Sequence, residues 1–138
     1  MKKTLLLAFV MAVSISCFGV KTLPILQAPF VEELSFLKEV VVKEGKLEKR
    51  EMKEPLLQPV LLLKLRNIEG KAHMELKVYR SKKLIKTYFF SFGEKNKYYS
   101  EVIIWKKLKC IDKEGEYLVA VFLNGQLLLF KSYFIHRK

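Results

Sequence analysis

Cysteine, histidine and aspartate are scarce in this chain of 138 residues, and their scarcity excludes several classes of protein. There are two cysteines, two histidines and a single aspartate, Asp112. Cys17 and Cys110 can form at most one disulfide, so a disulfide-rich scaffold is excluded. His73 and His136 stand far apart, and neither has a second ligand residue at the spacing of a metal site. Asp112 lies in a polar stretch before a glycine and is interpreted as a turn residue.

The sequence also lacks the patterns of common catalytic sites. Its glutamates are spread along the chain, without a pair that indicates acid–base chemistry of the glycosidase kind. Its glycines are dispersed, so no phosphate-binding loop is present. Cys110 with a distant histidine is not the signature of a nucleophile. We therefore predict a non-enzymatic protein with no catalytic residues, no cofactor and no metal.

No apolar run is long enough for a transmembrane helix. The run from Leu5 to Val13 is shorter than the roughly 20 residues that a span requires. It follows the basic Lys2 and Lys3 and precedes small residues, which is the pattern of a secretory signal peptide. We predict that residues 1–19 are this signal peptide and that the protein is exported to the periplasm or the cell envelope.

Cys17 follows the apolar run at the place where a bacterial lipoprotein carries its acylated cysteine. The preceding residues only loosely resemble a lipobox, because Ser14 stands where a larger aliphatic residue is usual. Lipidation of Cys17 and ordinary cleavage after Ser16 or Gly19 both remain open, and cleavage is favoured. Cleavage after Gly19 would leave Cys110 as a lone thiol, so the fold would depend on its core.

Negative charge is in short supply. Lysine and arginine number 26 against 14 acidic residues, and removing Lys2 and Lys3 with the signal peptide lowers the net charge from +12 to +10. Such a balance favours anionic polymers or lipid headgroups as partners. The alternative is a solvated lysine–glutamate surface of the kind common in thermophiles. The candidate residues for an anionic partner are Lys82, Lys83, Lys86, Lys106, Lys107 and Lys109. Export makes nucleic acid an unfavoured partner.

Hydropathy patterning predicts one β domain over residues 30–138, after a proline-containing linker at residues 20–29. Residues 72–79 alternate between apolar and polar side chains most regularly, and residues 60–66, 84–92 and 98–108 also indicate strands. Residues 30–43 fit either a helix, from their apolar spacing, or a strand, from their β-branched valines; a strand is favoured. Residues 46–54 are interpreted as a loop or an exposed edge strand.

The terminal segment carries the strongest fold signal. Asn124 and Gly125 separate two apolar runs, which predicts a hairpin with a type I′ turn. Asp112, Gly115 and Tyr117 precede the first of these runs, and this entry resembles the last hairpin of immunoglobulin-like and fibronectin-III-like sandwiches.

That resemblance implies an all-β, antiparallel, two-sheet immunoglobulin-like sandwich of about 7–8 strands. It also implies a tyrosine corner, in which Tyr117 bonds back to nearby backbone. Val119 replaces the cysteine of antibody domains, and Trp105 lies later than their conserved tryptophan. An antibody-type domain is thus excluded, and a bacterial immunoglobulin-like variant is expected.

Alternation across this hairpin predicts two faces. Tyr117, Val119, Val121, Leu123, Leu128, Phe130 and Phe134 are expected to face the core. The opposite face is unusually apolar, with Lys131 as its only charge, and it is our candidate interface. Its predicted members are Leu118, Ala120, Phe122, Leu127, Leu129, Tyr133 and Ile135. The N-terminal segment could cover this face instead.

The sequence thus predicts an exported, non-enzymatic module that docks through the outer face of its terminal hairpin. A protein partner or self-association would occupy that face. The alternatives are a small periplasmic inhibitor or chaperone-like protein that offers a β edge to a client, and a basic binder of anionic envelope polymers or lipids.

Overall fold

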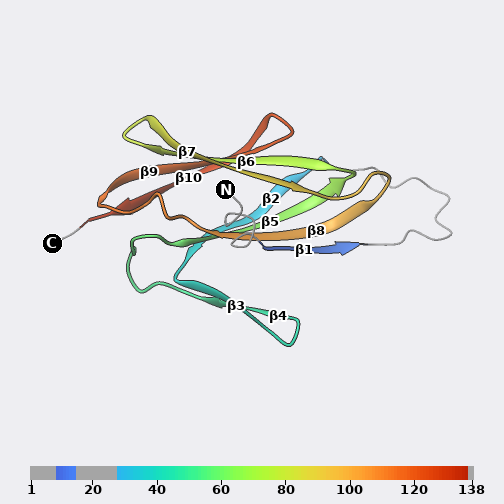
Figure 1. Cartoon of the computed structure of the whole chain (residues 1–138), viewed down its shortest axis with the longest axis horizontal. Coiled ribbons are helices and arrows are strands. Elements are labelled where there is room, and N and C mark those ends of the chain that lie inside the picture. The colour runs from blue at the N-terminus through green and yellow to red at the C-terminus, as the bar shows by residue number, and fades with distance from the viewer. Residues whose placement is uncertain (1–8, 15–27, 137–138) are drawn as a thin grey trace.

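The computed structural model describes residues 9–14 and 28–136, which form two stacked antiparallel sheets and a separate hairpin (Figure 1). Its strands are β1 (Phe9–Ser14), β2 (Phe30–Leu37), β3 (Glu39–Lys43), β4 (Lys46–Arg50), β5 (Val60–Glu69), β6 (Ala72–Arg80), β7 (Lys83–Phe92), β8 (Tyr98–Lys107), β9 (Gly115–Leu123) and β10 (Gln126–Ile135). The four-stranded sheets have the orders β1-β8-β5-β2 and β10-β9-β6-β7, and β3 pairs with β4. The predicted all-β, antiparallel two-sheet sandwich is confirmed.

The order of neighbouring strands can be compared with that of an immunoglobulin-type sandwich. There, strands A, B and E are neighbours in one sheet and strands C, F and G in the other. Here β2, β5 and β8 follow the first order, and β6, β9 and β10 follow the second. This likeness concerns architecture and implies no function.

Period-two alternation explains why the strands pair as they do. In β6, Ala72, Met74, Leu76 and Val78 are each no more than 1% exposed, whereas the residues between them are more open. These side chains pack against inward-facing residues of β5 and β9 in one core between the sheets. The cleanest alternation in the sequence therefore marks a central strand with one buried face.

The ambiguous segment at residues 30–43 is extended. Its first part is β2, which pairs with β5 so that Leu34 lies opposite Leu63. Its second part is β3, where the β-branched run at residues 40–42 favours the strand. β4 follows after a turn in which Glu44 and Gly45 have positive φ. It is an exposed edge strand, which is one of the two alternatives predicted for residues 46–54.

Part of the predicted signal peptide lies within the described residues. Phe9–Ser14 forms β1, which pairs with the outer edge of β8, Phe9 lying opposite Trp105. Cys17 and the expected cleavage sites lie outside the described residues, as does most of the predicted linker. Within the described ranges there is no helix with the length and apolarity needed to cross a bilayer.

Candidate functional site

The terminal hairpin is built as the sequence predicts. Asn124 and Gly125 have φ angles of 49° and 83°, as a type I′ turn requires. The Asn124 side-chain oxygen accepts a hydrogen bond from the His73 backbone N–H at 2.9 Å. The Asn124 backbone N–H in turn donates to the His73 carbonyl at 2.8 Å. The turn is therefore fixed to the start of β6.

A bulge at Leu128 reverses part of the predicted face assignment. Leu127 lies opposite Phe122 and Leu129 lies opposite Val121, so Leu128 has no directly opposed partner in β9. A one-residue shift moves every later side chain to the other face. The faces predicted for Leu129, Phe130, Lys131, Tyr133, Phe134 and Ile135 are consequently wrong. Phe130 and Phe134 are 59% and 44% exposed, whereas Tyr133 and Ile135 are 5% and 4% exposed.

The remaining predicted interface residues are distributed as follows. Leu118 and Phe122 are half-buried, and Leu127 is exposed on the outer face. Alternation along β9 places Ala120 on the outer face, but its small side chain is buried between Lys77 and Phe130 of the neighbouring strands. Leu129 lies opposite the inward-facing Val121 but is still exposed.

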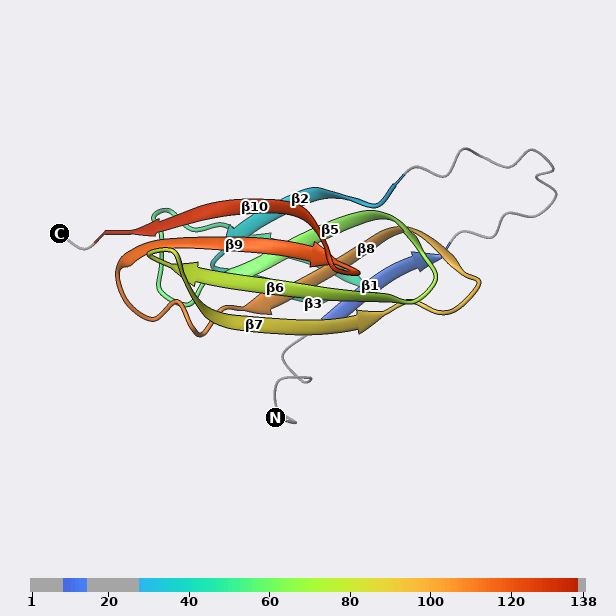
Figure 2. The same cartoon turned by 90° about the horizontal axis from the view of Figure 1, so that it is seen from above.

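The outer face of the β10-β9-β6-β7 sheet carries a group of large apolar side chains, which we call the aromatic face. Its members are Phe89, Phe122, Leu127, Phe130 and Phe134. Phe89 is 73% exposed on β7, and both Phe89 and Phe122 lie opposite Glu75 of β6. The Lys77 ammonium lies 4.8 Å from the centroid of the Phe122 ring, a cation–π distance. Figure 2 looks onto the outer side of the β10-β9-β6-β7 sheet, the side that carries these residues.

Two hollows flank the aromatic face. One, of about 530 Å³, lies where β6 turns into β7. It is lined by Tyr79, Ser81, Lys82, Glu116, Tyr117, Leu118 and Ser132. The other, of about 470 Å³, lies at the opposite end, between the Asn124–Gly125 turn and Phe89. Either volume could accept an anchoring side chain from a partner.

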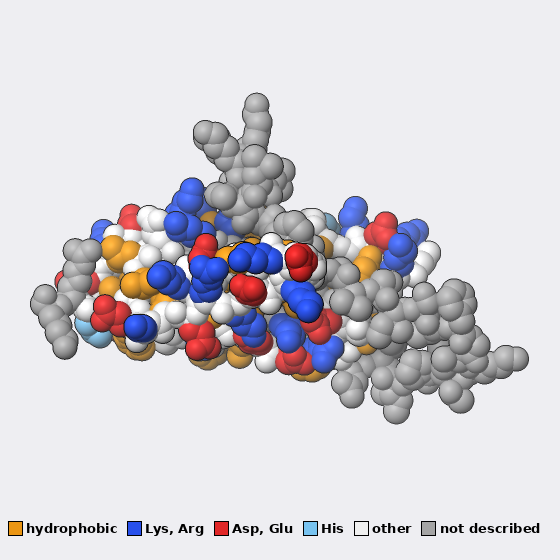
Figure 3. Space-filling model, turned by 90° about the horizontal axis from the view of Figure 1, so that it is seen from below, with side chains coloured by type: hydrophobic (Ala, Val, Ile, Leu, Met, Phe, Trp, Pro, Cys, Tyr) orange, Lys and Arg blue, Asp and Glu red, His pale blue; other side chains and the backbone are white. Residues whose placement is uncertain are grey.

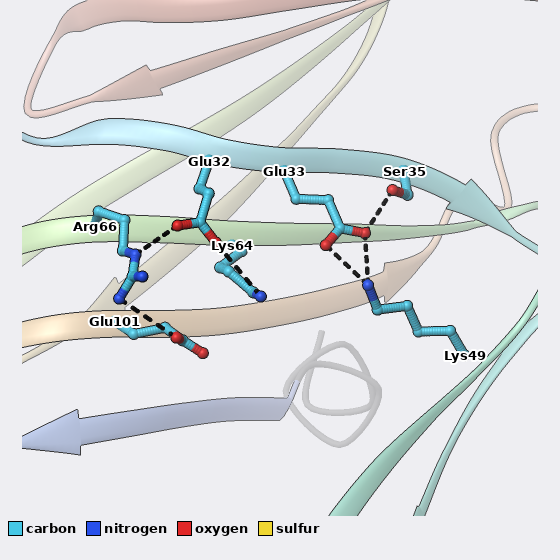
Figure 4. A network of polar contacts seen from close by, with 7 residues as sticks. All are labelled: Glu32, Glu33, Ser35, Lys49, Lys64, Arg66 and Glu101. Carbon is cyan, nitrogen blue, oxygen red and sulfur yellow. Dashed lines mark hydrogen bonds and ion pairs between the residues drawn. The ribbon is translucent and has the colours of Figure 1, made fainter.

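The outer face of the other sheet has the opposite character. Side chains of both charge signs cover much of it (Figure 3). Arg66 Nε lies 2.7 Å from a Glu32 carboxylate oxygen, and Arg66 also pairs with Glu101 (Figure 4). The hydrogen bond from Arg66 holds the pKa of Glu32 below its usual value. This face is therefore solvated and paired, as the exposed face of an antiparallel sheet is expected to be.

The predicted anionic-partner lysines do not form one patch. Lys86 and Lys106 lie 5.5 and 5.4 Å from the centroid of the Tyr88 ring. Burial, and then the charges of Lys109 and Lys86, lower the pKa of Lys106, whose side chain faces the core at the end of β8. The structure thus brings Lys86, Lys106 and Lys109 together. Lys82 lines the first hollow instead, and Lys83 and Lys107 are exposed at strand ends.

The remaining polar candidates form no evident reactive group. Cys110 is a free, half-buried thiol whose pKa is raised by burial. His73 Nδ1 lies 3.0 Å from the Ser91 hydroxyl, and the His136 ring stacks on Phe134. Among the described residues, no group of three or more histidine, cysteine, aspartate or glutamate side chains could hold a metal ion.

The sequence contains a usable signal for Phe89, although Phe89 is absent from the predicted interface. Tyr88, Phe90 and Phe92 of β7 face the core, so period two places Phe89 outside. Phe130 and Phe134 could not be placed in the same way, because the run of leucines at residues 127–129 gives no sign of the bulge.

The sequence matches no protein-family model, and no curated protein matches it significantly.

Proposed function

We propose that the protein is an exported, non-enzymatic binding module of the cell envelope that docks a protein partner through the aromatic face. The observation that carries this proposal is the contrast between the two outer faces. One sheet exposes paired charges, and the other exposes phenylalanines. Large apolar side chains gathered on one exposed face commonly mark an interface. The signal-peptide pattern at residues 1–19 supports export.

The structure also bears on what could cover this face. The segment Phe30–Leu37, one of the predicted covers, is instead strand β2 of the other sheet. A second copy of the processed chain would bring together two molecules that each have a net charge of +10, the +12 of the whole chain less Lys2 and Lys3, and these molecules repel each other. We therefore favour a different protein, less basic than this one, whose apolar side chains meet the phenylalanines.

The energetics permit a specific complex. Full burial of one large apolar side chain stabilises by about 1.5–3 kcal/mol. Phe89 and Phe130 are the two most exposed phenylalanines of the face, so each has much of this free energy left to gain. A partner side chain seated in the hollow beside Tyr79 and Leu118 would provide the anchor that binding hot spots require.

The test compares two sets of substitutions in cells that export the protein. Phe89→Ser and Phe130→Ser remove apolar surface from the aromatic face, and Val42→Ser removes an exposed apolar side chain from β3 as the matched control. A photocrosslinker at position 130 should give a discrete adduct that Phe89→Ser abolishes and Val42→Ser preserves. An adduct equally abundant with Phe89→Ser, or an equally abundant one from position 42, would contradict the proposal. Sedimentation distinguishes a homodimer from a hetero-complex.

A second candidate function rests on the lysines around Tyr88. Lys86, Lys106 and Lys109 concentrate positive charge at one end of the sandwich, and this favours a polyanion of the envelope. Binding to heparin, as a model polyanion, should weaken steeply with salt. Lys86→Gln with Lys109→Gln should weaken it more than Lys46→Gln, a control on the exposed hairpin. Equal effects, or salt-independent binding, would count against this candidate.

A further inference from the structure

Strand β8 has two partners, and they differ in origin. On one side it pairs with β5 from Val60 opposite Lys107 to Glu69 opposite Tyr98. On the other side it pairs with β1, in an uninterrupted register from Phe9 opposite Trp105 to Val13 opposite Glu101. β1 belongs to the stretch predicted to be removed on export. If it is removed, the backbone groups of β8 that face β1 lose their partners.

Among the described residues 28–136, no strand takes this place. β7 is followed by the turn at residues 93–97 and then directly by β8. In constant-type immunoglobulin sandwiches a fourth strand, D, pairs with strand E, which has the position of β8 here. β1 lies at that position, although it comes from the N-terminal end of the chain and not from the segment directly before β8 (Figure 1). The sheet therefore has a strand position beside β8 that would be empty in the processed chain.

The other sheet edges carry features that oppose pairing. β2 and β10 lie side by side, and the Lys131 ammonium donates to the Leu34 carbonyl at 3.0 Å. Phe36 of β2 and Tyr133 of β10 are also in contact, with their ring centroids 4.6 Å apart. β7 begins at Lys83, directly after Lys82, and has a register shift near Leu84. Lysines and bulges discourage the addition of a foreign strand.

The edge of β8 has a different composition. Its central residues are Val102, Ile103, Ile104 and Trp105, and β1 pairs with all four in a regular register. An apolar, regular edge of this kind is a template for β-augmentation. The sequence of β1, Phe-Val-Met-Ala-Val-Ser, shows the composition of a strand that pairs there.

We propose that, in the processed protein, the edge of β8 from Glu101 to Trp105 binds an extended apolar strand of a partner protein, antiparallel to β8 and in the place of β1. This proposal rests on the proposed export and cleavage, and it concerns a different surface from the aromatic face. Because the pairing is antiparallel, the residue of the incoming strand that lies two positions before the one opposite Trp105 would lie opposite the exposed Lys107. An acidic residue at that position should therefore strengthen binding.

The experiment uses the protein recovered from exporting cells, with its N-terminus defined by intact mass. A synthetic peptide with the sequence of residues 8–15 serves as the probe, and the same peptide with Met11→Pro is the control, because proline cannot donate to the ladder. Hydrogen exchange is followed at the amides of residues 101–105. The probe should slow alternate amides by at least about tenfold, and the proline peptide should not. The precursor should show this protection without any peptide.

Each result has a definite meaning. Retention of residues 1–19 in the exported protein would overturn the proposal, since the edge would stay filled. Equal protection by the two peptides, or none by either, would overturn it too. A dimer that protects these amides without peptide would assign the edge to a second copy. In a peptide of residues 7–15, Leu7→Glu should bind more tightly than Leu7→Lys, and the reverse order would refute the acidic preference. Phe89→Ser should leave all these results unchanged, which separates this proposal from the aromatic face.

Discussion

The hydroxyl of Tyr117 donates a hydrogen bond to the backbone carbonyl of Lys113, at 2.7 Å. Tyr117 is the third residue of β9 and is only 1% exposed, so its ring belongs to the core while its hydroxyl holds the loop that enters the strand. The geometry is that of a tyrosine corner. Arg80 lies over the same ring, 5.9 Å from its centroid, and donates to the Glu114 carbonyl. The β8–β9 connection is thus fixed at the end of the sheet that carries the aromatic face.

Removal of the Tyr117 hydroxyl should destabilise the fold without changing it. Tyr117→Phe keeps the buried ring and leaves the Lys113 carbonyl without this donor, so a loss of about 1–2 kcal/mol is expected. Urea denaturation followed by circular dichroism measures the change. Tyr117→Ala also loses the ring, and a loss of about 3–5 kcal/mol is expected. If Tyr117→Phe is as stable as the native chain, the hydrogen bond contributes nothing.

Two substitutions separate the roles of Asn124. Asn124→Gly keeps a residue that tolerates positive φ but loses the side-chain oxygen that accepts the hydrogen bond from the His73 N–H, at a cost of about 0.5–1.5 kcal/mol. Asn124→Ala also forces alanine into the left-handed region, which adds about 1 kcal/mol. The free energy of unfolding should therefore fall in the order native, glycine, alanine. An alanine variant as stable as the glycine variant would show that φ at this position carries no strain.

The sequence was sufficient to predict the strands wherever apolar and polar residues alternate with a period of two. Residues 72–79 alternate without exception, and the Asn124–Gly125 turn has its own conformational requirement. The segment at residues 30–43 was harder, because its apolar spacing fits a helix and only pairing with β5 decides against it. A local sequence pattern does not reveal pairing with a distant strand, so the sequence alone could not decide between a helix and a strand for this segment.

The candidate site was less accessible to sequence reasoning. The outer face of the hairpin was expected to be apolar, but the bulge at Leu128 places Phe130 and Phe134 there instead of Tyr133 and Ile135. Lys106 was expected on a charged surface, yet it lies on the buried side of β8 opposite Leu61. A long side chain can place its amine at the sheet edge while its stem is buried, and the sequence does not reveal this.

Neighbouring residues at the end of β10 provide the sharpest test of the corrected faces. Ile135 is 4% exposed and Phe134 is 44% exposed. Ile135→Ala should therefore lower the free energy of unfolding by about 2–4 kcal/mol. Phe134→Ala should change it by no more than about 0.5 kcal/mol, although it removes the larger side chain. The opposite ranking in urea denaturation would restore the face assignment without a bulge.

Acid should weaken the attachment of the β3–β4 hairpin to the sandwich. Lys49 Nζ lies 2.8 Å from a Glu33 carboxylate oxygen. Burial acts to raise the pKa of Glu33, but the hydrogen bonds from Lys49 and Ser35 outweigh it and the pKa is lowered. A lowered pKa means that this stabilisation is complete above the unfolded pKa of about 4.3 and disappears as pH falls through the folded value.

Lys49→Met tests this dependence. At pH 7 it should lower the free energy of unfolding by no more than about 1 kcal/mol, because the pair is partly exposed. At a pH below the folded pKa of Glu33 the native and variant chains should be equally stable. Lys46→Met, on the same exposed hairpin, is the control. A difference between native and Lys49→Met chains that persists at low pH would mean that lost packing, and not charge, is responsible.

The Cys110 thiol should be protected from alkylation by its surroundings. Burial raises its pKa, although a hydrogen bond from Tyr88 and the charge of Lys86 oppose this effect. Because the thiolate is the reactive species, the alkylation rate with iodoacetamide should reach its midpoint at a higher pH in the folded chain than in the urea-unfolded chain. The same shift should make stability fall as pH rises through the folded pKa.

The chain with Cys17→Ser leaves Cys110 as the sole thiol for this measurement. Lys86→Gln removes a charge that favours the thiolate, so the midpoint of the folded chain should move further upward. Lys46→Gln lies on the distant hairpin and should leave the midpoint where it was. A folded midpoint at or below the unfolded one would show that the thiolate is stabilised at this position. The lysines around Tyr88 would then activate the thiol, and Cys110 would have to be treated as a reactive cysteine.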